Sequence, residues 1–198
     1  MDDLEELIKV KNWQRLVRKY SPQYLSKSLP FRESLVLSRK ILENEAWDGN
    51  LQNFAVKLIE ETKRSHPIEW ESNWKHEAYL GYAYGILVYE PEKEFDAYQK
   101  AAKSANPPPP EVMMELTANW SYPGIYQKKM TKEKAIEILE NVAGEIPYIE
   151  AVTRLAGLYE ETQQEKKAVY WKKVLKESQK KKLYDRRPYL DFFNEYGW

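Results

Sequence analysis

The chain of 198 residues contains no cysteine, only 7 glycines and only two histidines. The absence of cysteine excludes disulfides, a thiol nucleophile, iron–sulfur clusters and cysteine-based zinc sites. The low glycine content disfavours a turn-rich β-sandwich or barrel. A chain without disulfides fits a reducing compartment, and we therefore expect a cytoplasmic protein.

Charge and hydropathy give no reason to expect a membrane or nucleic acid as partner. The 31 Lys and Arg residues balance the 31 Asp and Glu residues, so the whole chain is neutral. No apolar run has the length needed to cross a bilayer. The acidic segment 1–6 is not followed by an apolar stretch of the kind found in secretory signals. We therefore expect no secretory signal.

The sequence offers no convincing catalytic site. The segment 76–80, His-Glu-Ala-Tyr-Leu, lacks the second histidine that a zincin motif requires. There is no glycine-rich phosphate loop and no Gly-x-Ser-x-Gly nucleophile elbow. Acidic neighbours such as Glu60-Glu61 point about 100° apart on a helix and do not converge on one substrate. We therefore expect no enzyme activity, no metal and no cofactor, with His66 at a helix end and His76 packed on a helix.

Apolar residues recur at helical spacing and nowhere alternate with a sustained period of two, which predicts an all-α fold. Ser21 and Thr131 are predicted N-caps, and Pro22 and Pro110 are predicted first helical residues. Helices are predicted over roughly residues 4–8, 13–20, 22–29, 31–42, 51–59, 68–89, 93–105, 111–119, 132–142, 147–159, 166–182 and 189–196.

The segment 68–89 is predicted as one long helix. Ala78, Gly81 and Gly85 lie on one stripe of that helix. Small side chains there would let a neighbouring helix approach closely.

A helical-hairpin pattern appears three times in the second half of the chain, over residues 74–107, 111–147 and 148–180. In the first hairpin the pattern consists of Leu80-Gly81-x-x-Tyr84 with Tyr98, Ala101 and Pro107. In the second it consists of Ala135, Leu139 and Pro147. In the third it consists of Leu155-Ala156-x-x-Tyr159 with Ala168 and Trp171.

These hairpins resemble tetratricopeptide (TPR) and Sel1-like repeats over roughly residues 74–180. The resemblance implies an α–α superhelix of stacked antiparallel hairpins, because one hairpin cannot bury its apolar face alone. We expect a single domain over 1–198, with atypical amino-terminal hairpins or a cap over 1–66, repeats over 67–182 and an aromatic capping helix over 183–198. An irregular helical bundle, whose Leu and Ala spacing reflects core packing alone, is the alternative.

The aromatic tail from Tyr189 to Trp198 is expected to pack over the end of the stack, because terminal repeats need a cap on their apolar edge. Alternatively, Trp198 could insert into a partner or into a second copy of the chain.

The resemblance also implies that the first helix of each hairpin lines a groove that binds a partner. We call the residues that it places there the predicted groove residues. They are Lys75, Tyr79, Tyr82, Glu111, Met114, Glu115, Glu150 and Arg154.

Basic residues predominate near the carboxyl end, between Gln164 and Arg187, with Tyr170, Trp171 and Tyr184 among them. The favoured interpretation is the solvated face of the last hairpin, with Trp171 in the core. The alternatives are a nucleic-acid surface and a patch that attracts an acidic protein. The residues of this possible anionic-partner patch are Lys172, Lys173, Lys176, Lys180, Lys181, Lys182, Arg186 and Arg187.

Together these observations predict a non-catalytic protein that binds a protein partner through a helical surface, as a monomer or weak homodimer. One concrete version is a bacterial immunity protein that neutralises a toxin by direct binding. The alternatives are an adaptor or regulator that recognises a peptide, and RNA binding through the basic carboxy-terminal helix.

Overall fold

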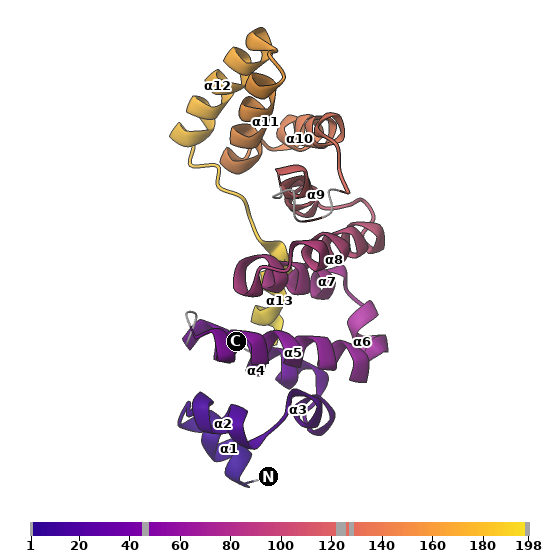
Figure 1. Cartoon of the computed structure of the whole chain (residues 1–198), viewed down its shortest axis with the longest axis vertical. Helices are drawn as coiled ribbons and strands as arrows, with labels where there is room; N and C mark the ends of the chain where they lie inside the picture. The colour runs from indigo at the N-terminus through magenta and orange to yellow at the C-terminus, as the bar shows by residue number, and fades with distance from the viewer. Residues whose placement is uncertain (1, 45–47, 122–125, 127–128, 197–198) are drawn as a thin grey trace. The chain divides into compact units, whose positions relative to one another are not determined.

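The computed structural model describes residues 2–44, 48–121, 126 and 129–196. Within those ranges every regular element is a helix and no strand occurs, so the all-α prediction is confirmed (Figure 1). The chain forms two compact units: unit 1 comprises Met1–Ala97 with Tyr189–Trp198, and unit 2 comprises Tyr98–Pro188. The predicted segments 1–66, 67–182 and 183–198 do not coincide with these units.

Unit 1 begins with short helices whose ends are set by local side chains. Ser21 Oγ accepts a hydrogen bond from the Tyr24 backbone N–H at 3.1 Å, which confirms the predicted N-cap ahead of Pro22. The elements of unit 1 are α1 (Asp2–Lys9), α2 (Trp13–Lys19), α3 (Pro22–Ser28), α4 (Phe31–Asn44), α5 (Gly49–Ser65), α6 (Pro67–Glu71), α7 (Trp74–Tyr82), the π-helix η1 (Ala83–Val88), the first half of α8 (Pro91–Ser104) and nearly all of α13 (Pro188–Glu195).

The prediction of one helix over 68–89 is wrong, because the segment divides into α6, α7 and η1. Asn73 Oδ1 accepts a hydrogen bond from the Lys75 N–H at 3.0 Å and so starts a new helix at Trp74. The π-helix ends at Tyr89, whose φ of 52° is left-handed. At Gly85 a methyl group would collide with the Glu94 carboxylate of α8, so the close neighbour at this glycine is a side chain.

Two apolar clusters form the core of unit 1. The first joins α1 to α5 through buried leucines such as Leu16, Leu25 and Leu51. The second gathers aromatic rings from α4, α6, α7 and α13, including Phe31, Trp70, Tyr79, Phe192 and Phe193.

The aromatic tail therefore belongs to unit 1. Phe192 and Phe193 are fully buried there, and their rings contact Tyr79 edge-on at centroid distances of 6.0 and 4.9 Å. The prediction that the tail caps the last hairpin is wrong for these residues, because their rings fill space between α4 and α7. Gly197 and Trp198 lie outside the described residues.

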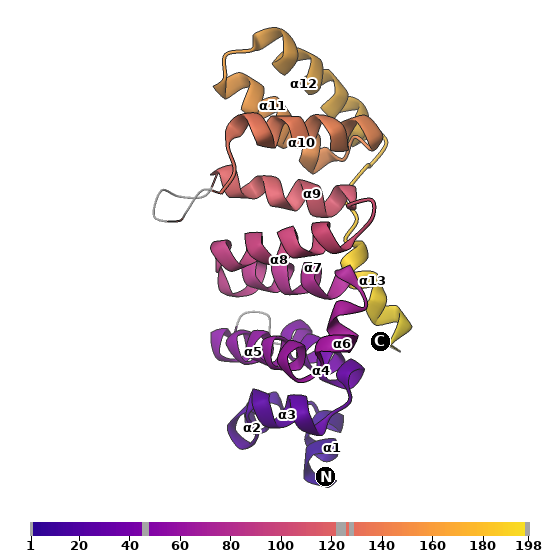
Figure 2. The ribbon, with the colours of Figure 1, turned by 90° about the vertical axis from the view of Figure 1, so that its right-hand side faces the viewer.

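Unit 2 contains the remainder of α8 and a series of antiparallel helices. Its α11 and α12 form the hairpin with the most extensive contact, and α10 packs on α11 (Figure 2). Thr131 Oγ1 accepts a hydrogen bond from the Lys134 N–H at 3.2 Å, as predicted for an N-cap. The other elements of unit 2 are α9 (Pro110–Leu116), the 3₁₀-helix η2 (Thr117–Ser121), α10 (Lys132–Glu145), α11 (Ile149–Glu161) and α12 (Glu165–Lys180).

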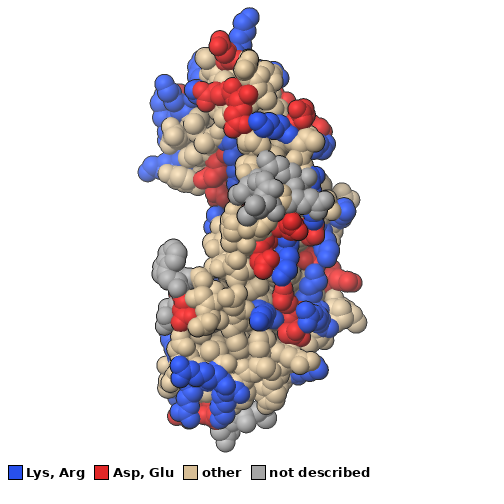
Figure 3. All heavy atoms as spheres, viewed as in Figure 1, with Lys and Arg blue, Asp and Glu red and all other residues tan. Residues whose placement is uncertain are grey.

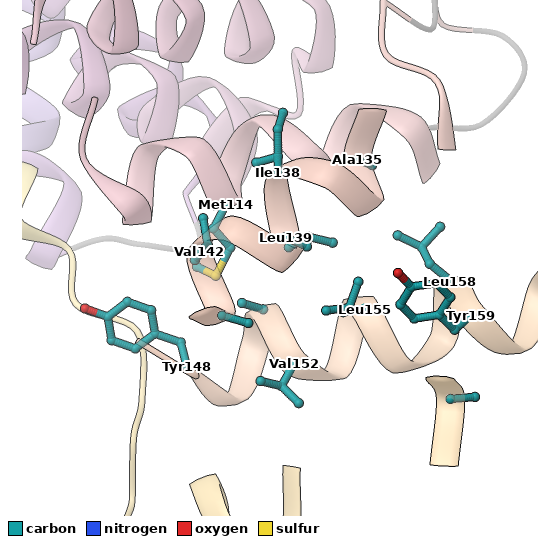
Figure 4. Packing of buried hydrophobic residues seen from close by; sticks show 13 residues of the cluster. Met114, Ala135, Ile138, Leu139, Val142, Tyr148, Val152, Leu155, Leu158 and Tyr159 are labelled. Atoms are coloured by element: carbon teal, nitrogen blue, oxygen red, sulfur yellow. The ribbon is translucent and has the colours of Figure 1, made fainter. Parts of the chain in front are cut away.

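The core of unit 2 contains most of the pattern residues of the second and third hairpins (Figure 4). Leu139 of α10 faces Leu155 and Tyr159 of α11, and Ala168 of α12 joins the same cluster. Both a stack of repeats and an irregular helical bundle require this burial. The packing therefore does not distinguish between these two hypotheses. The stacking of these hairpins into a superhelix stays a prediction.

Candidate functional site

Of the three predicted groove residues in unit 1, Tyr79 lies beneath α13. Tyr79 is 1% exposed, so the prediction that it lies on an open face is wrong: the rings of Phe192 and Phe193 cover it. Burial raises the pKa of the Tyr79 phenol above its ordinary value, although Ser38 partly offsets this effect. Lys75 and Tyr82 are half-buried.

A cavity of about 200 Å³ lies beside Tyr79 and is closed on one side by Leu190 of α13. The Arg39 guanidinium lies 4.5 Å from the Phe193 ring centroid, and its Nε donates to Glu43 Oε1 at 2.7 Å. The volume is below the range of roughly 300–1,000 Å³ that small-molecule sites occupy. The cavity is therefore smaller than an ordinary small-molecule site, and its two charged side chains, Arg39 and Glu43, pair with each other.

In unit 2, two of the predicted groove residues lie in the interior. Met114 is 1% exposed in the apolar core, and Glu111 is 8% exposed and accepts a hydrogen bond from the Tyr148 hydroxyl at 2.8 Å. Burial, together with this hydrogen bond to a carboxylate, raises the pKa of Tyr148 to about 12. The prediction of an open position is wrong for Glu111 and Met114, because α9 turns these side chains toward α11.

The other three, Glu115, Glu150 and Arg154, are half-buried in a polar cluster. Arg154 Nη1 donates to the carbonyl oxygen of Met114 at 2.7 Å, and Arg154 Nη2 lies 3.5 Å from Glu115 Oε2. Glu150 Oε2 accepts a hydrogen bond from the Asp185 N–H at 3.1 Å. Burial, and then the Glu150 charge, raise the pKa of Asp185.

These polar groups link α9, α11 and the segment after α12 and are partly shielded from solvent. The Ile149 N–H donates to the carbonyl oxygen of Leu183 at 2.8 Å, so the segment after α12 lies against the start of α11. Consequently, none of the eight predicted groove residues is fully exposed.

The basic stretch, in contrast, lies on the surface, where Lys and Arg side chains gather over α12 (Figure 3). Lys172 pairs with Glu160, Lys180 Nζ lies 2.8 Å from Glu177 Oε1, and Arg187 Nε lies 3.7 Å from Asp185 Oδ2. Within the described part of the chain, no ion pair involves the remaining members of the patch, which are Lys173, Lys176, Lys181, Lys182 and Arg186.

A largely apolar cavity of about 280 Å³ opens on this surface, and we call it the α12 cavity. Tyr170, which lines the cavity, is 59% exposed, and Val169 and Tyr184, each next in sequence to a lining residue, are 67% and 62% exposed. Trp171 is half-buried against the core, as predicted. The residues that line the α12 cavity are Pro147, Tyr170, Lys173, Val174, Glu177, Ser178, Lys181 and Leu183.

The tyrosines of this surface are evident in the sequence, but the cavity is not. Tyr170 and Val174 are four residues apart on α12 and therefore share a face, which was a usable signal. Pro147 and Leu183 come from outside α12, and only the fold brings them to the same place.

Both histidines are engaged by other groups of the fold. His66 ends α5, and its Nε2 lies 2.9 Å from the Ser26 carbonyl oxygen. His76 is buried on α7, with its ring nitrogens 2.9 Å from the Trp70 carbonyl oxygen and from the Tyr196 hydroxyl. The expected positions of both histidines are thus confirmed. Over the described ranges, His, Asp and Glu side chains form no group of three that could hold a metal.

Comparisons with known proteins identify no relative: no protein-family model, no curated protein and no solved structure matches the chain. The likeness to TPR and Sel1-like repeats therefore depends on the pattern residues alone. Among the helices that the structure describes, none has the length and apolar character required to span a bilayer.

Proposed function

We propose that the chain is a non-catalytic protein that binds a protein partner through unit 2. The supporting observation is the apolar α12 cavity together with the exposure of Tyr170, which lines it. Exposed apolar side chains in a contiguous patch mark interaction sites, and tyrosine is enriched at protein interfaces. Stacked TPR-like or Sel1-like hairpins would serve as the scaffold for this surface.

The proposal has two specific forms. A bacterial immunity protein would cover a folded toxin domain, and such an interface buries roughly 800 Å² on each partner. An adaptor would bind a short peptide, for which the α12 cavity and its immediate rim are sufficient. In both forms the partner contacts the α12 cavity and the residues around it, so one experiment tests both forms.

The experiment is affinity capture from a nuclease-treated lysate of the native host, with the wild-type chain and Tyr170→Ser compared. We expect one stoichiometric protein that the wild type retains and Tyr170→Ser loses. Tyr24→Ser is the matched control, because Tyr24 is an exposed tyrosine of α3 in unit 1. Capture of nucleic acid alone, lost with added salt and dependent on Lys180 to Lys182, would instead assign RNA binding to the basic helix.

A further inference from the structure

The α12 cavity combines an apolar lining with a basic rim. Lys173 and Lys181 stand at the rim, and within the described residues neither forms an ion pair. Glu177 is the single carboxylate of the lining, and Lys180 Nζ donates to it at 2.8 Å. That hydrogen bond, with the positive charges of Lys180 and Lys181, holds the pKa of Glu177 below its usual value. The mouth of the cavity therefore carries a net positive charge.

The walls of the cavity are fixed by backbone hydrogen bonds and do not need a ligand to form. Lys182 adopts a left-handed φ of 54°, which turns the chain back after α12. The Leu183 N–H then donates to the Ser178 carbonyl oxygen at 3.0 Å, and the Leu183 carbonyl accepts from the Ile149 N–H at 2.8 Å. A preformed site loses less conformational entropy on binding than a flexible one.

The volume of about 280 Å³ suits an apolar side chain more than a cofactor, because it is just below the small-molecule range of roughly 300–1,000 Å³. Nucleic acid suits this surface less well. A nucleic-acid groove needs a continuous cationic track, whereas Lys172 and Lys180 are already paired and Glu177 lines the cavity.

The acidic amino-terminal helix of a second copy is also a poor occupant. This amphipathic helix, α1, buries Leu4 and Leu7 in the core of unit 1. Those leucines are therefore not free to enter a cavity on another molecule.

On the proposed protein-binding function, we infer that the α12 cavity takes an acidic segment of a partner protein. The segment seats one aliphatic or aromatic side chain among Tyr170, Val174 and Leu183. Its carboxylates lie against Lys173 and Lys181 at the rim. Apolar contact in the cavity supplies affinity, and the charges at the rim supply specificity and speed of association.

The test is a selection of displayed random short peptides on the immobilised full chain, followed by binding measurements with the synthetic peptide of the enriched sequence. We expect enrichment of Asp and Glu around a single Leu, Ile, Phe or Trp. Replacing that apolar residue by Ser, or using Lys173→Glu/Lys181→Glu, should weaken binding at least about tenfold. Lys173→Gln/Lys181→Gln should also weaken peptide binding, but by a smaller factor.

The matched control is Lys100→Glu/Lys103→Glu, which makes the same charge change on exposed residues of unit 2 in α8. Its affinity for the peptide should equal that of the wild type. The inference is overturned if no sequence is enriched, if the apolar residue is dispensable, if the rim variants bind as the wild type does, or if single-stranded RNA binds more tightly than the peptide.

Failure of this inference and failure of the proposed function are distinguishable in the host capture. A stoichiometric partner retained by Lys173→Glu/Lys181→Glu keeps the protein-binding function and rejects the acidic segment as occupant. Capture of no protein by the wild type rejects the protein-binding function itself.

Discussion

The His76 imidazole and the Tyr196 hydroxyl share a hydrogen bond of 2.9 Å, although 120 residues separate them in the sequence. The other ring nitrogen of His76, Nδ1, lies 2.9 Å from the Trp70 carbonyl oxygen and must donate to it, because a carbonyl only accepts. In the neutral imidazole, Nε2 is then free to accept from the Tyr196 hydroxyl. A neutral, buried histidine thus links α7 to the end of α13.

The first prediction concerns pH. Burial lowers the pKa of His76 below its ordinary value of 6.5, with the Trp70 carbonyl and Glu77 opposing this effect in part. Below about pH 6.5 the unfolded chain therefore binds a proton that the folded histidine resists, so the free energy of unfolding falls as the pH falls. Urea unfolding at about pH 7.5 and about pH 5.5 measures the change, because ordinary carboxylates stay ionised over that interval.

In this experiment the His76→Gln variant should lose most of the pH dependence between the two values. His66→Gln is the control and should keep it, since His66 is the other histidine of the chain. An equal loss of stability on acidification in the wild type and in His76→Gln would contradict the role of His76.

The second prediction concerns α13. Removal of residues 188–198 should accelerate amide hydrogen exchange in α4 and α7, because Phe192 and Phe193 fill the core between them. Exchange in α11 and α12 should not change. In the full chain, Phe192→Ala should lower the free energy of unfolding by about 3–5 kcal/mol. Faster exchange in α11 and α12 instead would show that the tail caps the last hairpin.

The third prediction concerns Arg154. Arg154→Met removes the hydrogen bonds to the Met114 carbonyl and to Thr117 and the ion pair to Glu115. The free energy of unfolding should fall by about 1–3 kcal/mol, because the carbonyl and hydroxyl lose a charged donor. Arg154→Lys should restore little of it, since an ammonium cannot reproduce the guanidinium fork.

Arg186→Met is the matched control for Arg154→Met. Arg186 is exposed, so the control should change the free energy of unfolding by no more than about 0.5 kcal/mol. Equal effects of the two substitutions in urea unfolding would show that Arg154 has no structural role.

The fourth prediction concerns the end of α12. Lys182 has a left-handed φ of 54°, and the Lys182 and Leu183 N–H groups donate to the Gln179 and Ser178 carbonyls in the pattern of a Schellman motif. Lys182→Gly should raise the free energy of unfolding by about 1 kcal/mol, because glycine adopts this conformation without steric cost. Lys181→Gly removes the same charge from a residue in right-handed helical conformation and should not stabilise the chain. Equal thermal midpoints for the two variants would contradict this prediction.

Helix ends were predictable where one side chain decides them. Ser21 and Thr131 cap the helices that follow, as their positions before helical segments indicated. The break before Trp74 was missed, although Asn73 carried the same type of signal, because the apolar pattern on both sides suggested one continuous helix. A single hydrogen bond from the Lys75 N–H to the Asn73 side chain outweighs that pattern locally.

The burial of the predicted groove residues could not be foreseen from the sequence. Consecutive residues of α7, from Ala78 to Gly81, are buried, so the helix has no single apolar stripe that would identify its exposed side. Tyr79 became part of the core only because α13, distant in sequence, lies over it. Similarly, Glu111 is buried where it accepts a hydrogen bond from the Tyr148 hydroxyl. Periodicity within one helix does not reveal this contact, because Tyr148 lies 37 residues away in the sequence.

The sequence by itself determined the all-α class, most helix positions and the surface location of the basic stretch, because these depend on spacing and capping within one segment. Only the tertiary structure decided that the aromatic tail belongs to unit 1, that Tyr79 and Met114 are interior, and that Pro147 and Leu183 complete the α12 cavity. The physical reason is that burial depends on which distant segment covers a face, and helical periodicity does not specify that segment.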